Sequence, residues 1–190
     1  MTCIIGMIHE NKIYMGCDSA GVNEYGNASL TAIPKVFKRW NDSFIFGYSG
    51  SFRLGQILQY SFPFGDEVVP IKTPDEYMIG TFVGRLRDAL NKEGFMKKEN
   101  NLETMDANFL VGVKLLEDNK PHLYCVQSDL QCTRFTPPVL SIGSGYQYAL
   151  GAMTAYGRID LNPMQRIEKS LEIAALHCST VRGPFHVESI

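Results

Sequence analysis

The first eighteen residues form two apolar runs on either side of a polar turn at positions 9–12. Short apolar runs bounded by turn residues are typical of buried strands, so this pattern predicts a buried hairpin. Chain ends normally fray unless something holds them, yet the first expected strand begins at Thr2. If Met1 is removed, the Thr2 hydroxyl lies beside a free amine in the same residue. That arrangement is one recognised way to activate a nucleophile.

The rest of the chain alternates between strand patterns and helix patterns. Further strands are expected at 34–40, 44–48, 107–115, 122–126, 132–135, 140–142 and 185–188, with a short strand near 29–31 in a loop at 20–32. Apolar positions at helical spacing predict helices at 52–60, 73–93, 146–155 and 162–177. Two of these helices begin with a capping residue, Pro and then Glu or Gln, at 73–76 and 162–165. Polar or Pro-rich stretches at 61–72 and 97–106 predict loops, and 117–120 predicts a turn.

The order of these elements predicts the fold class. Hairpins connect most of the strands, in place of the single crossovers that parallel strands require. We therefore expect an α+β protein in which antiparallel sheets pack with helices on their outer sides. With 190 residues and neither a repeat nor a linker, the chain is expected to form a single domain over 1–190.

Composition narrows the function classes. The net charge of -2 does not favour nucleic acid or an anionic membrane surface, and no apolar run approaches a spanning helix. Five cysteines lack the spacing of a redox or zinc motif and are expected to be reduced and mostly buried, as in a cytoplasmic protein. The four histidines are scattered, so we expect neither a metal site nor a cofactor.

Several short motifs resemble functional loops or sites but also have simpler explanations. Gly143-Ser144-Gly145 follows a strand as a phosphate loop would, but it lacks the third glycine and the lysine of nucleotide-binding loops. The stretch 47–51 narrowly misses the GxSxG nucleophile elbow, although its backbone N–H groups could serve an oxyanion. Asp18 and Lys35 are charges within apolar strand contexts, which is costly unless they are paired. Composition alone leaves a structural ion pair or exposed strand ends as open explanations for these two residues.

A family resemblance runs through most of the chain. The segments 2–8, 15–19, 34–37, 46–50 and 142–149 stand in the order and near the spacing of proteasome β-type subunits. The similarity is greatest to the bacterial HslV (ClpQ) peptidases, and 170–175 resembles their C-terminal region. The Asp and Ser that proteasomal β subunits carry near the C-terminus are missing, since the chain reads His177-Cys178-Ser179 there.

The resemblance implies the N-terminal nucleophile (Ntn) hydrolase fold, a four-layer αββα sandwich of two antiparallel sheets. It implies that Thr2 is both nucleophile and amine base. Lys35 would favour the neutral amine by like-charge repulsion, and Asp18 would orient Lys35. Gly50 would supply an N–H to the oxyanion, and Ser144 would form a hydrogen bond near the Thr2 amine. Substrate contacts are assigned by the same resemblance to Ala20, Val22, Gly47 and Ser49.

The activity and partners that the resemblance implies leave three alternatives open. The first is a threonine-type endopeptidase that cleaves unfolded proteins inside a homo-oligomeric ring, with stacked rings and an AAA+ ATPase unfoldase as partner. The second is a catalytically silent ring or scaffold subunit that retains Met1. The third is an Ntn amidase acting on a small or specific amide. None of the three involves nucleic acid or a membrane.

Overall fold

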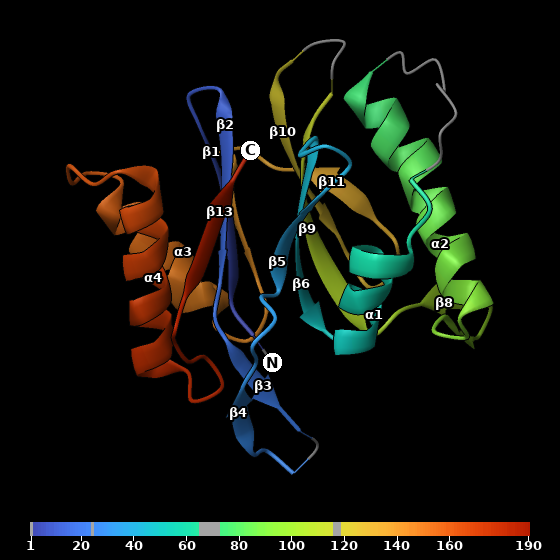
Figure 1. Ribbon diagram of the computed structural model, residues 1–190, viewed down its shortest axis with the longest axis horizontal. Coiled ribbons are helices and arrows are strands. Elements are labelled where there is room, and N and C mark those ends of the chain that lie inside the picture. Colours follow the sequence, from blue (N-terminus) through green and yellow to red (C-terminus); the bar gives the residue numbers. More distant parts are fainter. Residues whose placement is uncertain (1, 24, 65–72, 116–118) are drawn as a thin grey trace.

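The protein is a four-layer sandwich. The computed structural model describes residues 2–23, 25–64, 73–115 and 119–190, so part of the expected loop at 61–72 and of the turn at 117–120 lies outside it. Two antiparallel sheets face each other, and helices cover the outer face of each sheet (Figure 1). The α+β class and the αββα arrangement expected from the sequence are confirmed.

The first sheet has the order β12-β1-β2-β13 and is built on the N-terminal hairpin. Its strands are β1 (Ile4–His9), β2 (Lys12–Cys17), β12 (Val139–Ile142) and β13 (His186–Ser189). In the hairpin, Ile4 lies opposite Cys17 and Ile8 lies opposite Ile13. The expected buried hairpin is therefore present, and the two strands that flank it come from the last third of the chain.

The second sheet has the order β11-β10-β9-β6-β5. Its strands are β5 (Val36–Arg39), β6 (Phe44–Gly50), β9 (Ala107–Lys114), β10 (Pro121–Val126) and β11 (Cys132–Arg134). All five correspond to strands predicted from the sequence. Neighbouring strands are antiparallel throughout, as the hairpin connections require.

The helices form the two outer layers. On the second sheet lie α1 (Phe52–Gln56) with η1 (Ile57–Ser61), and η2 (Glu76–Phe82) with α2 (Val83–Lys92); on the first lie α3 (Tyr146–Tyr156) and α4 (Pro163–His177). Both predicted helix starts are capped: Thr73 Oγ1 accepts from the Glu76 N–H at 3.2 Å, and Asn162 forms a reciprocal capping box with Gln165. The helices expected at 52–60 and 73–93 differ from the prediction because each contains a π-helical segment.

Two small hairpins occupy stretches that the sequence predicts as largely irregular. β3 (Ala20–Val22) pairs with β4 (Ala28–Leu30) inside the expected loop at 20–32, and β7 (Lys97–Glu99) pairs with β8 (Leu102–Thr104) inside the expected loop at 97–106. Asn100 and Asn101 between β7 and β8 both have positive φ, of 50° and 65°. Asn tolerates this conformation, and a two-residue turn of this kind closes a hairpin even where the strands are polar.

Three apolar cores separate the four layers. One lies between the sheets, one lies between the second sheet and its helices, and one lies between the first sheet and α3 and α4. Along β1, Ile4 contributes to the core between the sheets, whereas Ile5 and Met7 belong to the core beneath α3 and α4. Cys3 shares the helix side, so the strand alternation places Thr2 on the side between the sheets.

The aromatic residues around η1 mostly pack inside the protein. Phe62 and Phe64 belong to the core beneath α1 and α2 and contact each other edge to face, with ring centroids 4.8 Å apart. Phe52 is partly buried against the same core, and Tyr60 alone of the four is largely exposed. The local core therefore accounts for most of these aromatics.

None of the helices in the described part of the chain has the length and apolar character of a membrane span.

Candidate active site

A buried ion pair lies at the end of the sandwich where the chain begins. Lys35 Nζ donates to Asp18 Oδ1 at 2.6 Å, and both side chains are almost completely inaccessible to solvent. Asp18 follows the last residue of β2, and Lys35 immediately precedes β5, so the pair joins the two sheets. Composition left open whether Asp18 and Lys35 lie at exposed strand ends, and this burial excludes that explanation. The Lys35 ammonium instead lies buried between the two sheets.

The Asp18 carboxylate also fixes the beginning of the chain. Its Oδ1 accepts from the Cys3 N–H at 3.0 Å as well as from Lys35, and its Oδ2 accepts from the N–H groups of Ala20 and Arg182 at 3.0 and 3.4 Å. In return, the Asp18 N–H donates to the Cys3 carbonyl at 3.2 Å. One carboxylate thus connects the buried ammonium to the residue that follows Thr2, which brings Thr2 and the ion pair together.

The turn between β12 and α3 holds the backbone of Thr2 from the other side. The Thr2 nitrogen donates to Ser144 Oγ at 3.2 Å, and the Thr2 carbonyl accepts from the Gly145 N–H at 3.2 Å. Gly143 has a φ of 93°, and a Cβ at that position would lie 2.2 Å from the Thr2 carbonyl oxygen. Only glycine allows this approach. The Gly-Ser-Gly motif, which resembles a phosphate loop in sequence, therefore holds the backbone of Thr2 in place.

The other residues assigned from the sequence lie around this centre in different ways. Gly50 ends β6 with a φ of 101°, two residues after Tyr48, whose N–H donates to the Lys35 carbonyl. Gly47 lies between the sheets, where a Cβ would come within 2.5 Å of Ile4 Cγ2. Ser49 is buried on the same strand. Ala20 contacts Asp18 through its N–H, and Val22 stands at the far end of β3, half-buried.

Sequence reasoning missed two side chains beside Thr2. Thr180 Oγ1 lies 2.7 Å from Ser144 Oγ, and Cys178 Sγ lies 3.6 Å from Ser144 Oγ and 3.2 Å from Thr180 Oγ1. Both residues follow α4, in the stretch where the Asp and Ser of proteasomal β subunits are missing. The sequence signal was the small polar run directly after the predicted C-terminal helix.

The cysteine next to Thr2 is poorly suited to act as a nucleophile. Cys3 is fully inaccessible, and burial raises the pKa of its thiol to about 12. Burial likewise raises the pKa of Cys17 and of Cys125 to about 11. Cys178 differs: burial acts to raise its pKa, but hydrogen bonds with Thr180 and Ser144 outweigh that effect and lower it. Because the thiolate is the reactive form, Cys3 stays inert at neutral pH.

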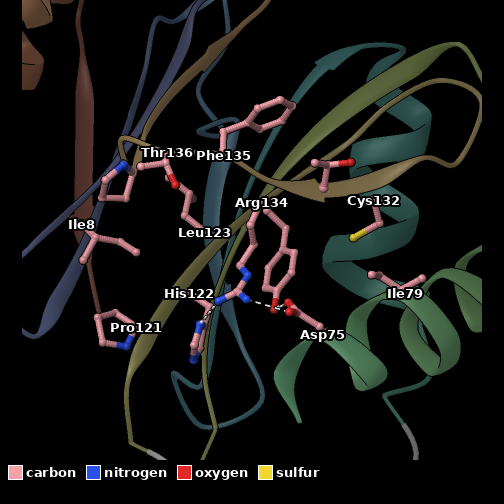
Figure 2. A pocket seen from close by; sticks show the side chains of 13 residues that line it. Ile8, Asp75, Ile79, Pro121, His122, Leu123, Cys132, Arg134, Phe135 and Thr136 are labelled. Carbon is pink, nitrogen blue, oxygen red and sulfur yellow. Dashed lines mark hydrogen bonds and ion pairs between the residues drawn. The ribbon is translucent and has the colours of Figure 1, made fainter.

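A separate cavity of about 730 Å³ lies far from Thr2, beside Ile8 at the other end of β1 (Figure 2). Ile8 lies six positions after Thr2 along an extended segment, a distance of roughly 20 Å. The polar side chains that line the cavity bind one another: Arg134 donates to Asp75 at 2.6 Å and contacts His122 Nδ1 at 3.0 Å. This cavity has no direct part in the chemistry at Thr2.

The close approach of Gly143 to the Thr2 carbonyl leads to a prediction. Gly143→Ala would require positive φ in a residue with a Cβ and would push the Thr2 carbonyl away. Since a displacement of about 1 Å can cost a reaction about 100-fold, we expect any reaction that Thr2 carries out to slow by about that factor or more. Gly151→Ala in α3 is the matched control, because a Cβ there meets nothing within 4 Å. Equal activity of the two variants would show that the turn does not position Thr2.

Comparisons with known proteins agree with this geometry. No family model matches the chain. Among curated proteins, the chain is 35% identical over 77 residues to the ATP-dependent protease subunit HslV of Aquifex aeolicus (strain VF5). This match covers 40% of the chain and 44% of the relative, so it spans less than half of that protein's length.

Solved structures match over the whole chain. A structure of Thiobacillus denitrificans BPH in complex with epoxomicin superposes with a TM-score of 0.80 at 18% identity, covering 100% of this chain and 98% of that one. Eukaryotic HslV from Trypanosoma brucei superposes with a TM-score of 0.67 at 19% identity, covering 99% and 98% of the two chains. At these identities the likeness establishes a shared fold.

Proposed function

Because this chain has the fold of the proteasome-β-like Ntn hydrolases and resembles HslV, we propose that it is a threonine-type peptidase. Its nucleophile is Thr2, after removal of Met1. The observation that carries the proposal is the convergence on Thr2 of the Asp18–Lys35 pair, acting through Cys3, and of the Ser144 turn. A purely structural ion pair has no need of a second set of contacts that fixes the first residue of the mature chain.

The proposed reaction follows from these positions. Thr2 Oγ1 attacks the carbonyl carbon of the scissile peptide bond, and the Thr2 amine takes the hydroxyl proton. The Gly50 N–H donates to the oxyanion that forms, and the amine then returns the proton to the leaving nitrogen as the peptide bond breaks. Water hydrolyses the ester on Thr2 in the second half of the cycle. The charge on Lys35 disfavours a resting ammonium at Thr2 by like-charge repulsion, which keeps the amine available as a base.

A panel of fluorogenic peptides and small amides tests this function. The peptidase proposal expects hydrolysis of peptides and no comparable turnover of the small amides. The reverse result would favour an Ntn amidase. The intact mass of the same preparation distinguishes the second alternative, because a silent subunit would retain Met1 and hydrolyse neither class.

We further propose that the chain works in a closed ring, stacked on a second ring, with Thr2 facing the enclosed space. An open proteolytic site would endanger other proteins, and the surface offers apolar area for contacts between subunits. Large exposed apolar side chains lie on or beside α3 and α4 and on the β3–β4 hairpin: Tyr146, Tyr148, Ile159, Met164, Leu176, Tyr25 and Leu30. An AAA+ unfoldase is proposed as the partner on the similarity to an ATP-dependent protease subunit.

The assembly proposal predicts the sedimentation behaviour of the purified protein. At micromolar concentration we expect a single large species, because the exposed apolar surface is more stable when covered. Leu176→Lys places a charge on a side chain that is 76% exposed and should shift the population toward smaller species. A monodisperse monomer of the unmodified chain would contradict the ring.

A further inference from the structure

Three side chains from two distant turns meet beside the Thr2 nitrogen. Ser144 comes from the turn before α3, while Cys178 and Thr180 come from the turn that follows α4. Ser144 Oγ is 2.7 Å from Thr180 Oγ1 and 3.6 Å from Cys178 Sγ, and the last two atoms are 3.2 Å apart. The three atoms therefore form a closed triangle, and the Thr2 nitrogen lies 3.2 Å from its Ser144 corner.

The number of available protons fixes how this triangle is arranged. Ser144 has one hydroxyl proton and two lone pairs. The Thr2 N–H and the Cys178 thiol both donate to it, which occupies both lone pairs. Its proton can then go to Thr180 Oγ1 at 2.7 Å or to the Thr2 carbonyl at 3.3 Å. The shorter contact has the usual length of a hydroxyl hydrogen bond, and the Thr2 carbonyl already accepts from the Gly145 N–H.

With the Ser144 proton on Thr180, every donor in the triangle has an acceptor. Ser144 donates to Thr180, Thr180 donates to the Cys178 sulfur, and the Cys178 thiol donates to Ser144. All three bonds run in the same direction around the ring, and hydrogen bonds connected in this way strengthen one another. The outcome is a Ser144 oxygen that presents only a lone pair to the Thr2 nitrogen.

We propose that Thr180 is a positioning residue, which holds the Ser144 proton away from the Thr2 amine and so keeps the amine lone pair free. The inference rests on the proposed function, since it matters only if that amine takes a proton from Oγ1. Without the Thr180 hydroxyl, the Ser144 proton turns toward the nearest remaining acceptor, the amine itself. Such a bond stabilises the neutral amine and occupies the lone pair that the reaction uses.

The charged surroundings of the amine are otherwise fixed. Among the described residues, contacts place four titratable side chains around it: Asp18 and Lys35 between the sheets, Cys3 on the helix side of β1, and Cys178 in the triangle. A Thr180→Val variant leaves the first three unchanged and removes a hydrogen bond from Cys178. A shift in amine titration in this variant would therefore come from the triangle and not from the ion pair.

The test compares Thr180→Val, which lacks the hydroxyl, with Thr180→Ser, which keeps it. Ser179→Ala is a second control, because it removes a neighbouring exposed hydroxyl that lies outside the triangle. For Thr180→Val we expect kcat for peptide hydrolysis to fall by about 10–100-fold with little change in KM, and the acidic limb of the pH profile to move to lower pH. Thr180→Ser and Ser179→Ala should behave like the unmodified chain. Equal melting temperatures would show that all variants are folded.

A second measurement follows the protonation of the Thr2 amine and does not rely on catalysis. Cyanate carbamylates only the neutral amine, so the pH midpoint of Thr2 carbamylation, followed by mass spectrometry of the N-terminal peptide, reports its titration. We expect this midpoint to be lower in Thr180→Val than in the unmodified chain. An unchanged midpoint, or a Thr180→Ser variant that behaves like Thr180→Val, would overturn the positioning role.

The two measurements distinguish the peptidase proposal from the proposed positioning role of Thr180. A lower midpoint in a chain that hydrolyses no peptide would support the triangle and contradict the peptidase. Peptide hydrolysis with an unchanged midpoint and an unchanged kcat in Thr180→Val would leave the peptidase standing and overturn the triangle. Met1 retained on the purified chain would overturn both.

Discussion

Thr2→Ala is expected to abolish peptide hydrolysis, with kcat/KM at least about 10⁴-fold lower, because it removes the attacking hydroxyl. The fold should survive, since the contacts that fix Thr2 use its backbone nitrogen and carbonyl and are available to Ala. Hydrolysis of the best fluorogenic peptide, measured beside the melting temperature, checks both parts of this expectation.

Two controls sharpen that result. Thr2→Ser keeps a hydroxyl next to the amine and should retain part of the activity. Cys3→Ala removes the neighbouring thiol, which is buried and has a raised pKa, and should leave turnover nearly unchanged. Activity that persists in Thr2→Ala, or that disappears in Cys3→Ala with the fold intact, would mean that the nucleophile has been misassigned.

The second large effect is expected at the buried ion pair. Lys35→Met keeps the length of the side chain and removes its charge, so we expect turnover to fall by about 10²–10⁴-fold while the protein remains folded. Asp18→Asn should be more harmful to stability, by about 3–5 kcal/mol, because it leaves a buried lysine without its partner. The amide would also face backbone donors that now bind a carboxylate. Chemical denaturation and peptide hydrolysis measure the two effects.

A double-mutant cycle shows whether Asp18 and Lys35 act as a unit. Residues in direct contact commonly show coupling of about 0.5–3 kcal/mol, so the double variant should lose less stability and less activity than the sum of the single changes. The matched control is the more exposed ion pair Arg53–Glu93, with an N–O distance of 3.0 Å, which should contribute little to stability. Additive losses at Asp18 and Lys35 would show that the two residues are independent.

Much of the fold follows from local patterns in the sequence. The apolar alternation in the first eighteen residues predicts β1 and β2, and the caps at Thr73 and Asn162 mark the starts of two helices. The polar hairpin β7–β8 was missed because its strands bury little, and the signal lies in a pair of Asn residues that accept positive φ. The π-helical segments were missed because a pattern of apolar positions does not specify which carbonyl each N–H reaches.

The residues of the candidate site differ in how far the sequence alone predicts them. Asp18 and Lys35 could be found because charges within apolar strands require a partner. The contact of Ser144 with Thr2 came from family resemblance, and the close approach of Gly143 to Thr2 depends on two segments that are distant in the sequence. Thr180 was missed although it lies in a small polar run, because a Thr after a helix is ordinary until its hydroxyl is seen to lie 2.7 Å from Ser144.

Covalent labelling by epoxomicin tests the central claim, that Thr2 is the mature N-terminal nucleophile, most directly. The purified chain is incubated with epoxomicin, its intact mass is measured, and the modified residue is located by peptide mapping. If Thr2 is that nucleophile, the chain should lack Met1 and carry one epoxomicin molecule, attached to Thr2, and a Thr2→Ala chain should carry none. A chain that retains Met1, or an adduct on any other residue, would contradict it.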